Sequence, residues 1–263
     1  MTVTMRFQGK SMVVTGAAQG IGRQVALEAA AEGARLVLVD RSPIVQSVAR
    51  EINEADGLGS AFALETDLET FAGNERFVAE ATARHGGIDV LVANVGGAIR
   101  MKPFEMFSEP EIVAEINRSL YPTLWACRAV LPVMLEQNRG SIVNVSSIAT
   151  MGINRMPYSA AKGAVNALTA SLAFEIGARN VRVNAIAPGG TTAPPRKVPR
   201  GPGAADDRER RWVKEVVDQT ISSSRMGRYG LVREMSAAIL FLASDAASYI
   251  TGTVLPVGGG DQG

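Results

Sequence analysis

The chain has 263 residues, of which 46% are apolar and 20% charged, and its 27 basic side chains nearly balance its 26 acidic ones. This length suits one α/β domain with a sizeable core. The near-neutral charge argues against a nucleic-acid-binding protein, which usually shows a basic excess. No apolar run reaches the length of a transmembrane helix, and residues 1–10 lack a signal-peptide core. We therefore expect a soluble cytoplasmic protein with neither membrane nor nucleic-acid partners.

The chain contains one cysteine and one histidine, Cys127 and His85. An intramolecular disulfide is therefore impossible, and a reducing compartment is expected. Most zinc sites are also excluded, because they need several Cys or His ligands. His85 lies in a polar, glycine-flanked run typical of a helix end at the surface. We expect no metal site.

Short apolar runs alternate with segments of helical period along the chain. We expect strands at residues 11–15, 35–39, 60–66, 89–93, 141–145, 181–186 and 253–257. We expect helices at residues 17–33, 43–56, 69–85, 158–177, 209–221 and 232–244, with one or two more at 109–138, broken near Pro122. Strands that alternate with helices predict a parallel sheet, and their continuously apolar sequences predict burial on both faces.

The predicted fold is therefore α/β, a single Rossmann-type doubly wound parallel sheet with helices on both faces. It spans residues 1–263 as one domain without a linker. Residues 190–207 are rich in Pro, Gly and charge and are long for a loop in a compact domain. We expect a substrate lid at about residues 190–211.

A glycine cluster, Gly16, Gly20 and Gly22, follows the first expected strand. Glycines there permit a tight turn and let a pyrophosphate approach the helix N-terminus, although such a cluster alone is weak evidence. Asp40 ends the second strand about 20 residues on, where a carboxylate accepts ribose hydroxyls and repels a 2′-phosphate. Asp40 could instead be a simple turn residue, and Arg41 could pair with a 2′-phosphate. Because the glycine loop carries no basic residue, the pattern favours NAD.

Tyr158 and Lys162 stand four residues apart at the start of an expected helix, and therefore on one face. A tyrosine with its usual pKa of about 10 is a poor base at neutral pH, but a nearby ammonium favours the phenolate. Ser146 and Ser147 end the fifth strand, where they face the ligand crevice of a parallel sheet. A Tyr–Lys pair at this spacing is also a common surface pair. The catalytic interpretation therefore depends on the glycine loop and the serines as well.

These motifs together resemble the short-chain dehydrogenase/reductase family over residues 9–260. The runs at residues 184–189 and 249–252 add to the match. The resemblance implies a nicotinamide cofactor and a homotetramer built through the helices at residues 119–137 and 158–177. It also implies that Tyr158, Lys162 and Ser147, rather than Ser146, are catalytic. The implied cofactor-binding residues are Gly16, Gln19, Gly20, Ile21, Gly22, Asp40, Asp67, Leu68, Asn94, Gly96, Tyr158, Lys162, Pro188, Gly189, Thr191 and Thr192.

Two positions depart from the family pattern. The family's Asn-Asn-Ala-Gly is here Ala93-Asn94-Val95-Gly96, so one asparagine is missing. The family's catalytic asparagine, which anchors a water relay to the lysine, falls on Ser119, with Asn117 two residues away. We expect either that Ser119 holds the water or that the proton path differs.

Four segments narrow the resemblance: NVGG at residues 94–97, SLYPTLWACRAVLP at 119–132, NRMPYSAAKG at 154–163 and APGGTTAPPR at 187–196. They are similar to the benzoate cis-diol dehydrogenases of bacterial aromatic degradation. That similarity implies NAD-dependent oxidation of 1,6-dihydroxycyclohexa-2,4-diene-1-carboxylate, followed by loss of carbon dioxide to give catechol. A carboxylated small-molecule substrate needs a cation. Ser147, Tyr158, Arg155 and Arg196 are the expected substrate-binding residues, with Arg118, Lys197 and Arg200 as further basic residues nearby.

Two other functions remain open at this stage. The same fold could act on another alcohol or ketone, such as a 3-oxoacyl compound, a sugar, a steroid or an uncharged cis-diol, because fold does not determine substrate. A catalytically silent NAD-binding scaffold belongs to a different class, and the intact Tyr158, Lys162 and Ser147 argue against it.

Overall fold

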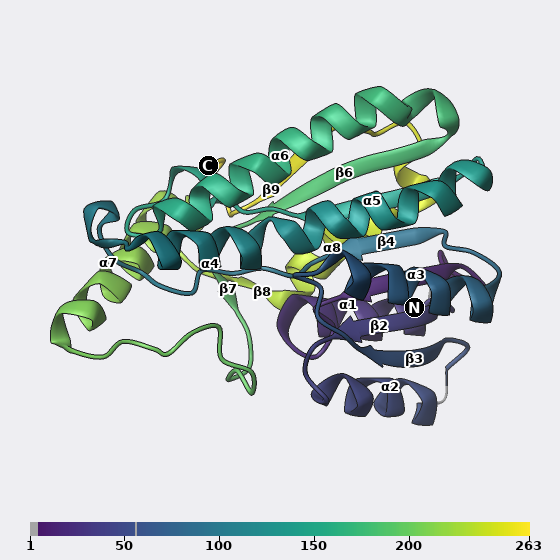
Figure 1. Cartoon of the computed structure of the whole chain (residues 1–263), viewed down its shortest axis with the longest axis horizontal. Coiled ribbons are helices and arrows are strands. Elements are labelled where there is room, and N and C mark those ends of the chain that lie inside the picture. Colours follow the sequence, from purple (N-terminus) through teal and green to yellow (C-terminus); the bar gives the residue numbers. More distant parts are fainter. Residues whose placement is uncertain (1–4, 56) are drawn as a thin grey trace.

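The computed structural model describes residues 5–55 and 57–263. Its main sheet has seven parallel strands in the order β3-β2-β1-β4-β5-β6-β9 (Figure 1). The strand order reverses between β1 and β4, which is where doubly wound sheets open a ligand crevice. The predicted fold class is confirmed. The strands are β1 (Ser11–Thr15), β2 (Arg35–Asp40), β3 (Ser60–Glu65), β4 (Val90–Ala93), β5 (Gly140–Val145), β6 (Val181–Pro188) and β9 (Val254–Val257).

Helices cover both faces of this sheet, because successive strand side chains point to opposite sides. In β1, Met12 and Val14 pack into one buried cluster, whereas Val13 packs into another. The first cluster takes its helical residues from α1 (Gly20–Ala31), α2 (Ile44–Glu54) and α8 (Val232–Ala243). The second takes them from α3 (Phe71–His85), α5 (Tyr121–Glu136) and α6 (Met156–Ile176). Figure 1 shows α4 (Glu109–Ser119) continuing from α5 past the end of the sheet.

Several helix boundaries differ from those predicted. The first helix begins at Gly20 rather than residue 17, because Gln19 has an extended backbone. Residues 109–138 form two helices that meet at Leu120, while Pro122 lies in the first turn of α5, where it has no hydrogen bond to lose. The helix α7 (Asp207–Ser223) begins early because the side chain of Asp206 caps it. Asp56 and residues 1–4 lie outside the described part of the chain.

A second, two-stranded sheet was not predicted. It pairs β7 (Thr191–Thr192) with β8 (Gly230–Leu231) in parallel. Residues 193–206 connect this sheet to α7 as a long irregular loop, at the expected position of the lid (Figure 1). Short 3-10 helices occur at Phe104–Met106, Ile148–Met151, Gly177–Arg179 and Asp245–Ala247. No helix within the described ranges is long and apolar enough to cross a membrane.

Candidate active site

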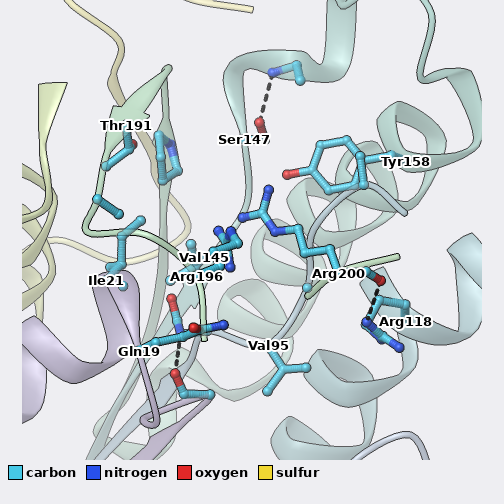
Figure 2. A pocket seen from close by; sticks show the side chains of 18 of the residues that line it. Gln19, Ile21, Val95, Arg118, Val145, Ser147, Tyr158, Thr191, Arg196 and Arg200 are labelled. Carbon is cyan, nitrogen blue, oxygen red and sulfur yellow. Dashed lines mark hydrogen bonds between the residues drawn. The ribbon is translucent and has the colours of Figure 1, made fainter. Parts of the chain in front are cut away.

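A cleft of about 570 Å³ lies at the carboxyl ends of the strands, beside the point where the strand order reverses. Figure 2 shows its two walls, with the glycine loop and Thr191 on one side and Ser147 and Tyr158 on the other. Most residues predicted for the site line it. They are Gly16, Gln19, Gly20, Ile21, Asp40, Asp67, Leu68, Asn94, Gly96, Ser147, Arg155, Tyr158, Lys162, Pro188, Gly189, Thr191 and Arg196.

The glycine loop has a shape that only glycines permit. Gly16 and Gly20 have φ angles of +66° and +62°, a region that favours glycine. A Cβ on Gly22 would lie 2.3 Å from the carbonyl oxygen of Gly16, so this glycine lets the helix pack against the loop. Asn94 joins β4 to the same loop, because its Nδ2 donates to the carbonyl oxygens of Thr15 and Gly16 at 3.1 and 3.2 Å.

Asp40 ends β2 with its carboxylate at the cleft. Its oxygens accept hydrogen bonds from the backbone N–H groups of Ala18 (3.1 Å) and Ser42 (3.0 Å), which hold the carboxylate beside the glycine loop. The neighbouring Arg41 faces Glu69, with 3.7 Å between Nη1 and Oε1, and Glu69 also pairs with Arg118 at 2.7 Å. The positive charge of Arg41 therefore lies within ion-pair distance of a carboxylate of the protein itself, Glu69, which Arg118 also contacts.

The two serines that end β5 have different environments. Both are buried, and the Ser146 hydroxyl is directed at α6, where its single proton can go to Asn166 Oδ1 or to the Lys162 carbonyl oxygen. The Ser147 hydroxyl caps the following 3-10 helix by accepting from the N–H of Ala149 at 3.0 Å. Figure 2 shows Ser147 on the same wall of the cleft as the Tyr158 hydroxyl. This arrangement favours Ser147 over Ser146 as the residue that contacts a substrate.

Lys162 is a buried cation close to Tyr158. Only 2% of the residue is exposed, its Nζ lies 6.0 Å from the centre of the Tyr158 ring, and it donates to the Val145 carbonyl oxygen at 2.6 Å. Burial, with a smaller contribution from the charge of Arg200, lowers the pKa of Lys162 to about 7. A group with such a pKa can gain or lose a proton at neutral pH.

Ser119 is completely buried at the end of α4, behind the cleft. Its Oγ accepts a hydrogen bond from the N–H of Gly97 at 3.3 Å. A Cβ on the intervening Gly96 would lie 3.0 Å from the Lys162 Nζ and 3.6 Å from the Ser119 Cα. The backbone at Ser119 is therefore close to the lysine.

Comparisons with known proteins agree with this geometry. Residues 10–200 match the short chain dehydrogenase family. The chain belongs to the short-chain dehydrogenase family. It is 61% identical to the 1,6-dihydroxycyclohexa-2,4-diene-1-carboxylate dehydrogenase of Acinetobacter baylyi over 263 residues, covering 100% of both chains. It is 56% identical to the enzyme of the same name from Pseudomonas putida, covering 98% of this chain and 94% of that one.

Solved structures show the same fold. The crystal structure of levodione reductase superposes with a TM-score of 0.87 at 30% identity, covering 98% of this chain and 99% of that one. Structures of this fold include complexes with NAD and with NADP. The cleft of this short-chain dehydrogenase is accordingly that of an oxidoreductase that uses a nicotinamide dinucleotide.

The two arginines predicted to bind substrate both line the cleft of the dehydrogenase. Arg155 precedes α6, and its Nη2 donates to Thr220 (3.4 Å) and Gln219 (3.5 Å) of α7. Its Nε is buried without a hydrogen-bond partner among residues 5–55 and 57–263. Arg196 lies on the loop after β7, and burial together with the charge of Arg200 lowers its pKa to about 10.

Three predicted residues do not line the cleft. Gly22 and Ser119 support it from behind, and Thr192 is exposed and pairs with Leu231. Arg200 was noted in the sequence only as one of several basic residues near the lid, yet it reaches into the cleft (Figure 2). Its placement depends on the path of residues 193–206, which have no periodic pattern from which a conformation could be predicted.

Proposed function

We propose that this short-chain dehydrogenase oxidises 1,6-dihydroxycyclohexa-2,4-diene-1-carboxylate with NAD, forming catechol after loss of carbon dioxide. The observation that carries the proposal is a Tyr–Lys–Ser set that shares its cleft with arginines. Neither Arg155 nor Arg196 takes part in an ion pair within the described chain. The relatives bearing this activity in their names, at 61% and 56% identity, support the same substrate.

The cleft fits NAD in three respects. Gly20 has open space on its Cβ side, so a pyrophosphate can approach the N-terminus of α1 closely. Asp40 offers a carboxylate where the adenosine ribose of a dinucleotide sits in this fold, and Arg41 is paired with Glu69. Asp67 and Leu68 extend the adenine side of the cleft, while Pro188 ends β6 on the nicotinamide side, followed by Gly189 and Thr191.

Catalysis divides among the chain's own side chains. Bound NAD supplies the acceptor for the hydride that leaves the substrate carbon. Tyr158 accepts the proton of the hydroxyl being oxidised, and Lys162 stabilises the phenolate form of the tyrosine. Ser147 donates a hydrogen bond that orients the substrate oxygen. Ser119 occupies the position of the family asparagine and, through Gly97, shapes the backbone between itself and Lys162.

The rest of the reaction needs no further residue. Oxidation of the ring carbon that bears hydrogen gives a ketone beside the carbon that carries the carboxylate, which is a β-keto acid. Such an acid loses carbon dioxide readily, and the electron pair left behind forms the aromatic enol. The arginines that line the cleft, Arg155 and Arg196 among them, supply the positive charge that attracts the carboxylate before this step.

A comparison of two substrates tests the proposed function. The purified enzyme with NAD is given the diol acid and, separately, the uncharged cis-diol without the carboxylate, and NADH absorbance is followed. We expect a higher kcat/KM for the acid. A higher value for the uncharged diol would replace the proposal with a plain cis-diol dehydrogenase, and NADH formation from neither would overturn it in favour of another alcohol or ketone substrate or of a silent scaffold.

The assembly and the compartment are part of the same proposal. A homotetramer would cover Phe174, an apolar residue of α6 that is 94% exposed in the monomer and lies on one of the two predicted interface helices. Light scattering should give about four times the mass of the 27.7 kDa chain. Cys127 is a buried free thiol, which suits the reducing cytoplasm.

A further inference from the structure

Arg200 brings a cation from the lid to the catalytic end of the cleft. Its carbonyl oxygen accepts a hydrogen bond from Arg118 Nη1 at 3.4 Å, which holds the backbone near the end of α4. From there the side chain turns into the cleft, and Figure 2 shows its guanidinium pointing toward the hydroxyl of Tyr158.

Gly97 makes this position possible. A Cβ at residue 97 would lie 2.4 Å from Nε and 2.7 Å from Cζ of Arg200, far inside van der Waals contact. Gly97 also has a φ angle of +140°, which other residues rarely adopt. Gly96 is close in the same way to Lys162, since a Cβ there would lie 3.0 Å from Nζ. Two adjacent glycines, which have no Cβ, therefore leave room for two cationic side chains beside Tyr158.

No acidic side chain among the described residues forms an ion pair with these cations. The ion pairs formed within residues 5–55 and 57–263 include none for Lys162, Arg196 or Arg200. The charge of Arg200 instead helps to lower the pKa of both Lys162 and Arg196. Glu115 is an acid that feels the charge of Arg200, but burial raises the pKa of its carboxyl, and one of its oxygens accepts from the backbone N–H groups of Ile99 and Arg100. An anionic ligand would relieve the repulsion among the three cations.

We propose that Arg200, seated over Gly97, is the principal ligand of the substrate carboxylate. The inference rests on the proposed function. In the diol acid, the carboxylate is on the ring carbon next to the one being oxidised, so its ligand must lie beside the Tyr158 hydroxyl. Arg155 is held by Gln219 and Thr220 on α7, whereas Arg200 has only its backbone held and can direct both Nη groups at a carboxylate. Gly97 is then a specificity-determining residue, because it admits the arginine.

The test measures KM and kcat for Arg200→Ala and Gly97→Ala with the diol acid and the uncharged cis-diol, each at saturating NAD. Loss of the carboxylate contact should raise KM for the acid at least about tenfold, and should lower the ratio of kcat/KM for the acid to kcat/KM for the uncharged diol by a similar factor, whereas a general disturbance of the site would lower both values together. Because both changes remove one interaction, the double variant should be no worse than the more severe single variant. Lys197→Ala is the control, since it removes a lid cation that does not line the cleft.

Benzoate supplies a readout independent of turnover. The Kd of benzoate for the NAD-saturated enzyme, measured by calorimetry, should rise at least about tenfold in Arg200→Ala. In Lys197→Ala it should stay within about twofold of the wild-type value. If the wild type oxidises the acid but Arg200→Ala changes neither KM nor benzoate binding, the inference is wrong and the proposed function stands. If Arg155→Ala or Arg196→Ala has the larger effect, that arginine is the principal ligand instead. If the wild type does not oxidise the acid, the proposed function fails and the inference fails with it.

Discussion

The side chain of Gln19 brackets the backbone of Val198: Nε2 donates to the Val198 carbonyl oxygen at 2.8 Å, and Oε1 accepts from the Val198 N–H at 3.1 Å. The N–H of Lys197 donates to the same Oε1 at 3.0 Å. Gln19 belongs to the glycine loop, and Val198 lies in the loop between β7 and α7. One amide side chain therefore connects the glycine loop to the loop of residues 193–206, the proposed lid, across the cleft.

Gln19→Ala should release the lid. Each of the three hydrogen bonds contributes about 0.5–1.5 kcal/mol, so the open population should rise about tenfold or more. Limited trypsin digestion of the NAD-free enzyme should cleave faster by that factor after Arg196, Lys197 or Arg200. NAD with substrate should slow cleavage of the wild type. The matched control is Gln24→Ala, whose amide, within the described part of the chain, hydrogen-bonds to Glu28 one turn along α1. Equal cleavage rates in the two variants would show that the Gln19 hydrogen bonds do not hold the loop of residues 193–206 closed.

Asp40→Ser should shift the cofactor preference toward NADP. The carboxylate that repels a 2′-phosphate is removed, while a hydroxyl remains for the backbone N–H groups of Ala18 and Ser42. We expect kcat/KM to fall about tenfold or more with NAD, the scale of one charge-assisted hydrogen bond, and to rise with NADP. Arg41→Ala is the control and should leave the preference for NAD intact. A wild type that works faster with NADP than with NAD at equal low concentration would exclude the assignment.

The features that the sequence predicted best are those set by local physics. Strand β1 reads SMVVT and is buried at every position, because helices cover both faces of the parallel sheet and its central residues Met12, Val13 and Val14 are apolar. The turn at Gly16 and Gly20 was likewise predictable, since it needs residues that tolerate positive φ. The short pair β7–β8 was not, because two-residue strands have no period to detect.

The site was harder to predict wherever it depends on the lid. Gln19 was expected at the cofactor, and it does line the cleft, but its amide is committed to residues 179 positions away. The close approach of Arg200 to Gly97 likewise joins an irregular loop to the segment that follows β4. Asp206 shows a signal that was available: an Asp three residues before Glu209 is a common helix N-cap, and it places the start of α7 two residues earlier.

Tyr158→Phe should abolish most turnover without weakening the binding of NAD. The substitution keeps the ring above which Lys162 Nζ lies, 6.0 Å from its centre, and removes only the hydroxyl that accepts the proton. Loss of a general base costs about 10² to 10⁴ in rate. Stopped-flow or steady-state NADH formation measures the rate, and fluorescence titration measures the Kd for NAD. Activity within twofold of the wild type would remove Tyr158 from the mechanism.

Lys162→Met should stabilise the NAD-free protein while it abolishes turnover. A lysine whose pKa falls from 10.5 to about 7 on burial destabilises the fold by at most about 5 kcal/mol when protonated. The substitution also leaves the Val145 carbonyl oxygen without its 2.6 Å partner, which costs about 1–3 kcal/mol. The net gain should be about 2 kcal/mol, or a rise in Tm of about 4–8 °C at pH 6.

The pH dependence of this gain separates burial of the charge from simple repacking. The folded pKa of Lys162 lies below the unfolded value, so the penalty is complete below pH 7 and disappears as pH rises toward 10.5. The difference in Tm between Lys162→Met and the wild type should therefore shrink between pH 7 and pH 10, as measured by scanning calorimetry. Lys214→Met replaces a lysine whose side chain is 72% exposed and should show no such trend. If Lys162→Met melts below the wild type at pH 6, or if the difference is constant with pH, the buried ammonium is not a source of instability.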